Sequence, residues 1–241
     1  MKIIEKLAAR DRDPFNNGPV VIACLGDSVT HGCFEFVKNP DGSPDARYAP
    51  DEGYVAMLKR EIDMLFPRAA VSVMNCGIGG DSTEGALKRF DRDVARVKPD
   101  LVTVDLGLNN AVNDDNAKAI LSYTESLEGI FGKCRDIGAE CVYITPNMLN
   151  TYVSALVPPP FDKFAELTAK AQNEGAFDEL IEAGRKQAEK SGAAVADAYA
   201  DWKRMFLSGV DTTRLLANCI NHPVPFMHAV FAQRALEAMF S

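Results

Sequence analysis

Four short blocks of small and polar residues contain the groups that acyl-transfer chemistry needs. The blocks are Gly26-Asp27-Ser28, Gly77-Ile78-Gly79-Gly80, Gly107-Leu108-Asn109-Asn110 and Asn218-Cys219-Ile220-Asn221-His222. Together they supply a hydroxyl nucleophile, backbone N–H donors at glycines, an amide side chain and an imidazole. A base must take the proton of the nucleophile, and fixed N–H donors must stabilise the oxyanion. The blocks therefore predict a hydrolase active site.

The first three blocks each follow a short apolar run of strand length. Five such runs occur, at residues 20–25, 71–74, 101–106, 141–144 and 193–196. Amphipathic segments of helical period separate them, at residues 54–66, 82–97, 117–137 and 177–190. This alternation predicts a flavodoxin-like three-layer α/β/α sandwich around a five-stranded parallel sheet. In such a sheet ligands bind beyond the carboxyl ends of the strands, where the blocks lie.

Two long segments interrupt the alternation and are expected to be loops that form pocket walls or lids. Residues 34–50 contain Asn39-Pro40-Asp41-Gly42, which is typical of a turn. Residues 147–173 contain Pro158-Pro159-Pro160 and a predicted short helix. Within that second segment, Met148 and Tyr152 could either pack in the core or line the substrate pocket.

Composition excludes several classes of protein. The 241 residues are 47% hydrophobic and 25% charged, and the net charge is −8. Without a basic run, a nucleic-acid partner is not expected. No apolar stretch approaches the ~20 residues of a membrane span.

The first residues and the cysteines point to the cytoplasm. The segment Met1-Lys2-Ile3-Ile4-Glu5-Lys6 mixes acidic and basic residues and has no apolar core, so it does not resemble a signal peptide. Six cysteines without a C-x-x-C pair are expected to be reduced thiols, and structural zinc is not expected. We expect one domain over residues 1–241, with its core blocks between about residues 20 and 240.

Taken in order, the four blocks resemble those of the SGNH (GDSL) hydrolases, the GDSL-type esterase/lipase superfamily. That family is named for one Ser, Gly, Asn and His in four separate blocks. The resemblance extends from Val20 to about Phe240, nearly the whole chain. It implies a serine ester hydrolase that forms an acyl-serine intermediate and uses neither a metal nor an organic cofactor.

The resemblance also assigns a role to one residue of each block. Ser28 would be the nucleophile, and its own N–H would be one oxyanion donor. Gly80 would supply a second backbone N–H, and Asn109 a side-chain N–H. His222 would be the general base that activates Ser28 and then protonates the leaving alcohol.

Two departures from the family pattern concern the base and its partner. The family usually has an acid three residues before the histidine, where this chain has Cys219, preceded by Asn218. Its third block usually ends in an acid, where this chain has Asn110. An imidazole still needs a partner that fixes its tautomer. Either a backbone carbonyl near Asn218 or a more distant acid such as Asp211 is expected to orient the ring.

Other residues have simpler explanations. His31, three residues after Ser28, is expected on the first helical turn as a pocket wall, and His228 on a helix face. Asp27 is expected to cap the turn. The glycines of the second block lack the G-x-G-x-x-G pattern and the lysine of phosphate-binding loops. Cysteines at strand ends more often pack as small apolar residues than act as nucleophiles.

These observations favour hydrolysis of a short acyl ester, with acetyl as one candidate, on a small soluble or carbohydrate substrate. The chain shows no broad apolar surface helix suited to lipid docking. Thioesterase or lysophospholipase activity is an alternative within the family. The missing acid supports a different alternative, a ligand-binding protein that has lost catalysis.

Overall fold

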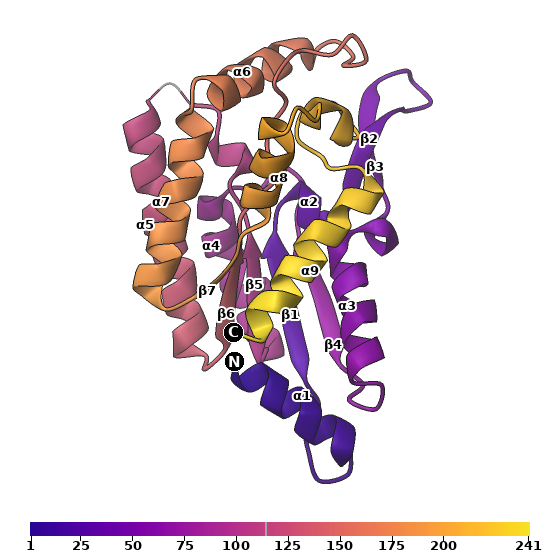
Figure 1. The fold of residues 1–241 in the computed structure, drawn as a ribbon, viewed down its shortest axis with the longest axis vertical. Helices are drawn as coiled ribbons and strands as arrows, with labels where there is room; N and C mark the ends of the chain where they lie inside the picture. The colour runs from indigo at the N-terminus through magenta and orange to yellow at the C-terminus, as the bar shows by residue number, and fades with distance from the viewer. Residues whose placement is uncertain (114) are drawn as a thin grey trace.

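The centre of the fold is a sheet of five parallel strands (Figure 1). The computed structural model describes residues 1–113 and 115–241. Strand order across the sheet is β4-β1-β5-β6-β7. The bounds are β1 (Val21–Gly26), β4 (Ser72–Gly77), β5 (Leu101–Asp105), β6 (Glu140–Ile144) and β7 (Ala194–Ala196). The predicted α/β sandwich with five parallel strands is confirmed.

Helices cover both faces of this sheet. On one face, α3 (Tyr54–Leu65) packs against α9 (His228–Met239), which also contacts β6 and β7. Figure 1 shows α9 crossing in front of the strands and α3 standing beside β4. A second group, whose members pack against one another, consists of α4 (Thr83–Asp93), α5 (Asn116–Asp136) and α7 (Ala176–Ser191).

Shorter helices connect these layers. The remaining α-helices are α1 (Lys2–Arg12), α2 (Ser28–His31), α6 (Asp162–Asn173) and α8 (Ala198–Leu207). Single 3₁₀ turns are η1 (Pro50–Glu52), η2 (Ala95–Val97), η3 (Leu108–Asn110), η4 (Thr212–Leu215) and η5 (Pro225–Met227). The short helix expected after the proline run is α6, which begins at Asp162.

Burial explains why the central strands read as continuous apolar runs. Residues 22–26 of β1 and all of β5 are buried, because both faces of these strands are covered. Helix α7 shows the complementary pattern of an amphipathic helix, with Phe177, Leu180 and Ile181 buried and its charged side chains outside.

The segment 34–50, expected to be a loop, is instead an antiparallel hairpin of β2 (Cys33–Lys38) and β3 (Pro44–Tyr48). The turn predicted within it closes this hairpin, with Asn39 N–H donating to Ser43 O at 2.8 Å. Its strands pair only with each other and are largely exposed beyond their first residues. Strands this short and exposed lack the long apolar pattern that identifies the central ones.

Among the described residues, no helix combines the length and apolarity needed to cross a membrane.

The end of β1 offers a test of how tightly the sheet positions the first block. A Cβ on Gly26 would lie 1.9 Å from Thr30 Oγ1 and 2.7 Å from Asp105 O. Gly26→Ala should lower the free energy of unfolding by about 1–3 kcal/mol, the usual range for overpacking. The melting temperature should then fall by roughly 2–4 °C per kcal/mol. Gly18→Ala is the control, since no heavy atom lies within 4 Å of its added Cβ; an equal loss in both variants would contradict this.

Candidate active site

A cavity of about 480 Å³ lies where β1, β4 and β5 end, and all four predicted catalytic residues line it. Ser28 follows β1, Gly80 follows β4 and Asn109 follows β5. His222 comes from the loop before α9. The structure therefore brings together residues that are separated by up to 194 positions in the chain.

Ser28 is the first residue of α2, and its side chain is buried at the base of the cavity. The first N–H groups of a helix have no partner within the helix, so the Ser28 N–H is available to a ligand. Asp27 caps this turn as predicted, because its Oδ1 accepts a bond of 3.0 Å from Val29 N–H. Burial raises the pKa of Asp27 to about 7, an effect to which the nearby Asp81 adds.

Two further N–H donors lie beside Ser28. Gly80 has a φ of +79°, which favours glycine, and a Cβ there would meet no heavy atom within 4 Å. In the described part of the chain, no atom accepts a hydrogen bond from Gly80 N–H. Asn109 Nδ2 donates one hydrogen to Asp81 O at 2.8 Å. Because an amide nitrogen has two hydrogens, the second remains available to a ligand in the cavity.

The imidazole of His222 is oriented by a main-chain carbonyl. Its Nδ1 lies 2.9 Å from Phe34 O. A carbonyl oxygen only accepts hydrogen bonds, so in the neutral ring the proton must be on Nδ1. Nε2 then has a free lone pair, which is the form a general base requires.

Burial also sets how readily this ring accepts a proton. It lowers the pKa of His222 below the usual 6.5, and the hydrogen bond to Phe34 O opposes the shift only in part. The ring is therefore neutral at pH 7.

Neither side chain considered as a partner of His222 contacts its ring. Asn218 Oδ1 instead accepts the N–H groups of Ile220, Asn221 and His222 at 2.9–3.0 Å, and so fixes the backbone of the loop. Asp211 accepts a bond of 2.9 Å from Tyr152 OH and caps η4. The group that orients the His222 ring is therefore a backbone carbonyl, which was one of the two alternatives. It belongs to Phe34 in β2, however, and not to a residue near Asn218.

The other two histidines have structural surroundings. His31 Nδ1 accepts a bond of 3.3 Å from Gly79 N–H, and its ring packs against Tyr48. It thus lies behind the cavity wall that Tyr48 and Gly79 form. His228 begins α9 as a fully buried residue, and its Nδ1 accepts a bond from Tyr54 N–H. Burial lowers the pKa of His228 to about 3.

Asn110 takes part in a hydrogen-bond network outside the main cavity. Its Nδ2 donates to Thr83 Oγ1 and to Glu84 Oε2, each at 3.2 Å. Burial alone would raise the pKa of Glu84, but hydrogen bonds from Ser122 and other neighbours hold it at about 2. The ionised Glu84 therefore contacts residue 110, where the family usually has an acid. An amide at this position can donate a hydrogen bond to Glu84, whereas a second carboxylate could not.

Met148 and Tyr152 are not among the residues that line the cavity. Met148 is buried in the main core, and Tyr152 is exposed beside Asp211. Sequence reasoning missed the cavity's aromatic side chains. Phe36 of the hairpin stacks on Phe161 at a centroid distance of 4.7 Å, and Phe164 lies beside them in the lining. The sequence did contain a signal for this aromatic wall, since all three phenylalanines lie within the two long segments that were expected to form pocket walls.

The thiols and the acids of the site suggest no other chemistry. Burial raises the pKa of Cys24 to about 12 and that of Cys33, in the cavity wall, to about 11, so both stay protonated. Within residues 1–113 and 115–241, no three His, Cys, Asp or Glu side chains are grouped as metal ligands would be.

Comparison with known proteins identifies the family. The sequence profile of the GDSL-like lipase/acylhydrolase family matches residues 24–230. The chain belongs to this family. An acetylxylan esterase of Geobacillus stearothermophilus is 31% identical over 86 residues. That match covers 36% of this chain and 37% of the esterase, so the chain spans little more than a third of that curated relative in the alignment.

Solved structures of several hydrolases share the fold. An α/β hydrolase from the metagenome of Lake Arreo, Spain, superposes with a TM-score of 0.67 at 20% identity, covering 92% of this chain and 95% of that one. The G. stearothermophilus acetylxylan esterase gives 0.65 at 19% identity, with 91% and 94% covered. A lipase/acylhydrolase of Enterococcus faecalis gives 0.64 at 23%, with 91% and 95% covered. Membership of this GDSL family supports a carboxylic ester hydrolase.

The orientation of His222 predicts the pH dependence of esterase activity. Protonated Nε2 cannot accept the Ser28 proton, so kcat/KM should rise with pH and level off above the pKa of His222. Since burial lowers that pKa, the midpoint should lie below 6.5. His222→Ala should remove this limb and reduce turnover by about 10²–10⁴-fold. His31→Gln, which retains an acceptor for Gly79 N–H, should keep the limb; its loss there would assign the base to His31.

The position of Asn109 predicts a kinetic effect confined to the transition state. Asn109→Ala should lower kcat by ~10²-fold or more, because one oxyanion donor is lost, and should leave KM nearly unchanged. Steady-state kinetics with a chromogenic acetyl ester measure both constants. An unchanged kcat would remove Asn109 from the site.

Proposed function

We propose that this protein is a serine ester hydrolase that works through an acyl-serine intermediate with a Ser28–His222 dyad. The observation that supports the proposal most directly is the shared cavity. Ser28, Gly80, Asn109 and His222 all line one cavity, and the hydrogen bond of His222 Nδ1 to Phe34 O leaves Nε2 as the basic nitrogen of the ring. These are the nucleophile, the base and the oxyanion donors of acyl transfer.

In the first half of the reaction, Ser28 Oγ attacks the ester carbonyl carbon while its proton moves to His222 Nε2. The carbonyl oxygen becomes an oxyanion, which the three N–H groups stabilise. When this intermediate collapses, the bond to the alcohol oxygen breaks and His222 Nε2 returns its proton to that oxygen. The products are the free alcohol and acyl-Ser28.

In the second half, water takes the place of the alcohol. His222 Nε2 accepts a proton from water as its oxygen attacks the acyl carbon, and the same donors hold the second oxyanion. Collapse breaks the bond to Ser28 Oγ, which takes the proton back from Nε2. A carboxylic acid leaves, and both catalytic side chains return to their starting state.

The cavity and the relatives favour an uncharged ester with a short acyl group. Among the described residues, no lysine or arginine lines the cavity, so it lacks a cation to hold an anionic substrate. Its wall is mainly apolar and includes the stacked Phe36 and Phe161. The likeness to an acetylxylan esterase makes acetyl the first acyl group to test, on a carbohydrate or another small alcohol.

Two alternatives remain distinct from this proposal. A thioesterase or lysophospholipase would use the same dyad, and a series of acyl lengths and thioesters would identify it by kcat/KM. A catalytically inactive ligand-binding protein would keep the cavity without an activated serine. The observation in its favour is that, among residues 1–113 and 115–241, no carboxylate forms a hydrogen bond with the His222 ring.

Reaction with a fluorophosphonate probe separates a hydrolase from a binding protein. We expect the folded protein to gain one phosphonyl group, located on Ser28 by peptide mass spectrometry, because the activated hydroxyl attacks phosphorus as it would an ester carbonyl. Ser28→Ala should not react, and His222→Ala should react far more slowly. A folded wild-type protein that shows no modification of Ser28 would favour the binding protein.

A further inference from the structure

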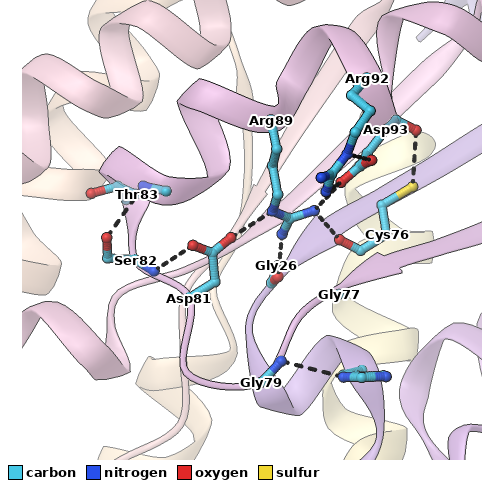
Figure 2. Close-up of polar contacts among 12 residues, drawn as sticks. Gly26, Cys76, Gly77, Gly79, Asp81, Ser82, Thr83, Arg89, Arg92 and Asp93 are labelled. Atoms are coloured by element: carbon cyan, nitrogen blue, oxygen red, sulfur yellow. Dashed lines mark hydrogen bonds and ion pairs between the residues drawn. The ribbon is translucent and has the colours of Figure 1, made fainter.

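Arg89 is a buried cation of α4 that reaches the ends of two strands and the loop beside them. Its Nε donates to Asp81 Oδ2 at 2.6 Å, and one terminal nitrogen donates to Gly26 O at 2.9 Å. The other terminal nitrogen donates to Cys76 O at 2.7 Å and to Asp93 Oδ2 at 3.0 Å. Figure 2 shows the guanidinium at the centre of these four partners. The Arg89 side chain is only 8% exposed.

These contacts connect the segments that provide the oxyanion donors. Gly26 ends β1 and stands two residues before Ser28. Asp81 follows Gly80 directly, and its own carbonyl oxygen accepts the bond from Asn109 Nδ2 at 2.8 Å. Arg89 thus bonds to Gly26, two residues before Ser28, and to Asp81, the residue after Gly80. Asp81 in turn accepts the hydrogen bond of Asn109.

The carboxylate of Asp81 completes this connection. Its Oδ1 accepts Ser82 N–H at 3.0 Å, while its Oδ2 is held by Arg89 (Figure 2). Both oxygens are therefore engaged, and the backbone between Gly80 and Ser82 has little freedom to turn. The direction of Gly80 N–H and the position of Asp81 O depend on this segment.

We propose that Arg89 is a positioning residue that sets the geometry of the oxyanion hole. The role rests on the proposed ester hydrolysis, but it goes beyond it by assigning a function to a residue outside the cavity. Arg89 touches no substrate; it acts by fixing where the three N–H groups converge. Preorganised donors stabilise an oxyanion far better than donors that must first move into place.

A planar guanidinium suits this position and a lysine does not. The guanidinium of arginine is planar and donates hydrogen bonds in several fixed directions at once. The ammonium of lysine is a compact charge and cannot reach acceptors that lie several ångströms apart. Lysine at 89 can keep the ion pair with Asp81 or reach one carbonyl, but it cannot hold Gly26 O, Cys76 O and Asp81 together. Arg89→Lys therefore keeps the charge and removes the connection.

The chain offers a matched control on the same helix. Arg92 also pairs with Asp93, with bonds of 2.6 and 2.8 Å, but its side chain is 67% exposed and has no hydrogen bond to Gly26, Cys76 or Asp81 (Figure 2). Arg92→Lys makes the same chemical change three residues away. It should leave both kcat and KM as in the wild type.

The test compares these variants with a chromogenic acetyl ester. Arg89→Lys should lower kcat by about 10-fold or more, since small displacements of aligned groups have large kinetic effects. KM should change by less than about 3-fold, because ground-state binding does not use the oxyanion geometry. The pH midpoint of kcat/KM should stay unchanged, since Arg89 does not contact His222. Affinity for a boronic acid that forms a tetrahedral adduct should fall by the same factor as kcat/KM.

A double variant distinguishes positioning from general damage. If Arg89 acts through the oxyanion donors, the loss in Arg89→Lys/Asn109→Ala should be smaller than the product of the two single losses. Losses that multiply, or an Arg89→Lys enzyme with wild-type kcat, would overturn the proposal while Asn109→Ala still supports the proposed function. A wild-type protein that hydrolyses no ester would overturn both.

A second variant avoids reliance on the folding of Arg89→Lys. A Cβ on Gly85 would lie 1.9 Å from Asp81 Oδ1, so Gly85→Ala displaces the carboxylate without removing any charge. It should also lower kcat with little change in KM, and melting temperatures confirm that the variants compared are folded. If Gly85→Ala keeps the wild-type kcat, then the Asp81 carboxylate does not link Arg89 to the oxyanion donors, and the proposal fails.

Discussion

Parallel pairing of β1 along both of its edges is the constraint on which the active site depends. Gly26, the last residue of β1, lies opposite Gly77 of β4 on one side and opposite Asp105 of β5 on the other. The three strands therefore end at the same level, and the loops after them open side by side. The next strand of the sheet along the chain, β4, lies on one side of β1, and the following strand, β5, lies on the other side. A doubly wound sheet forms its binding crevice where the strand order reverses in this way.

The same register places acidic side chains under the site, and burial determines their charge. Burial raises the pKa of Asp105 well above its usual value, and nearby Asp27 adds to the effect. The buried site therefore favours the neutral form of the Asp105 carboxyl. The charges of Arg89 and Arg92 together balance those of Asp81 and Asp93, because Arg89 pairs with both aspartates and Arg92 pairs with Asp93.

The sequence was sufficient to predict the five strands and the three blocks that follow β1, β4 and β5, because buried parallel strands are continuous apolar runs. The hairpin could not be predicted, since its short strands pair only with each other. Nor could the partner of His222, because every residue has a carbonyl and no side-chain type identifies Phe34 O. Arg89 lies on an amphipathic helix, where a charged residue ordinarily faces solvent. Only the tertiary structure shows that it points inward.

A carbonyl partner in β2 makes the orientation of the His222 ring depend on the hairpin. A carboxylate at the His222 ring would stabilise the imidazolium by its charge, whereas Phe34 O fixes the tautomer and offers only a dipole. The position of that oxygen depends on the hairpin, where the Phe34 ring packs against the Arg47 guanidinium and the His228 ring. Arg47 in turn pairs with Glu35 and Glu52.

Phe36 of the same strand lines the cavity, so one strand both forms part of the cavity wall and holds the His222 ring. A substrate that displaces β2 would therefore alter the direction of Nε2 as well as its own binding. In a site with a side-chain acid next to the histidine, these two properties belong to separate parts of the chain. In the proposed hydrolase, both would depend on two residues of one strand, Phe34 and Phe36.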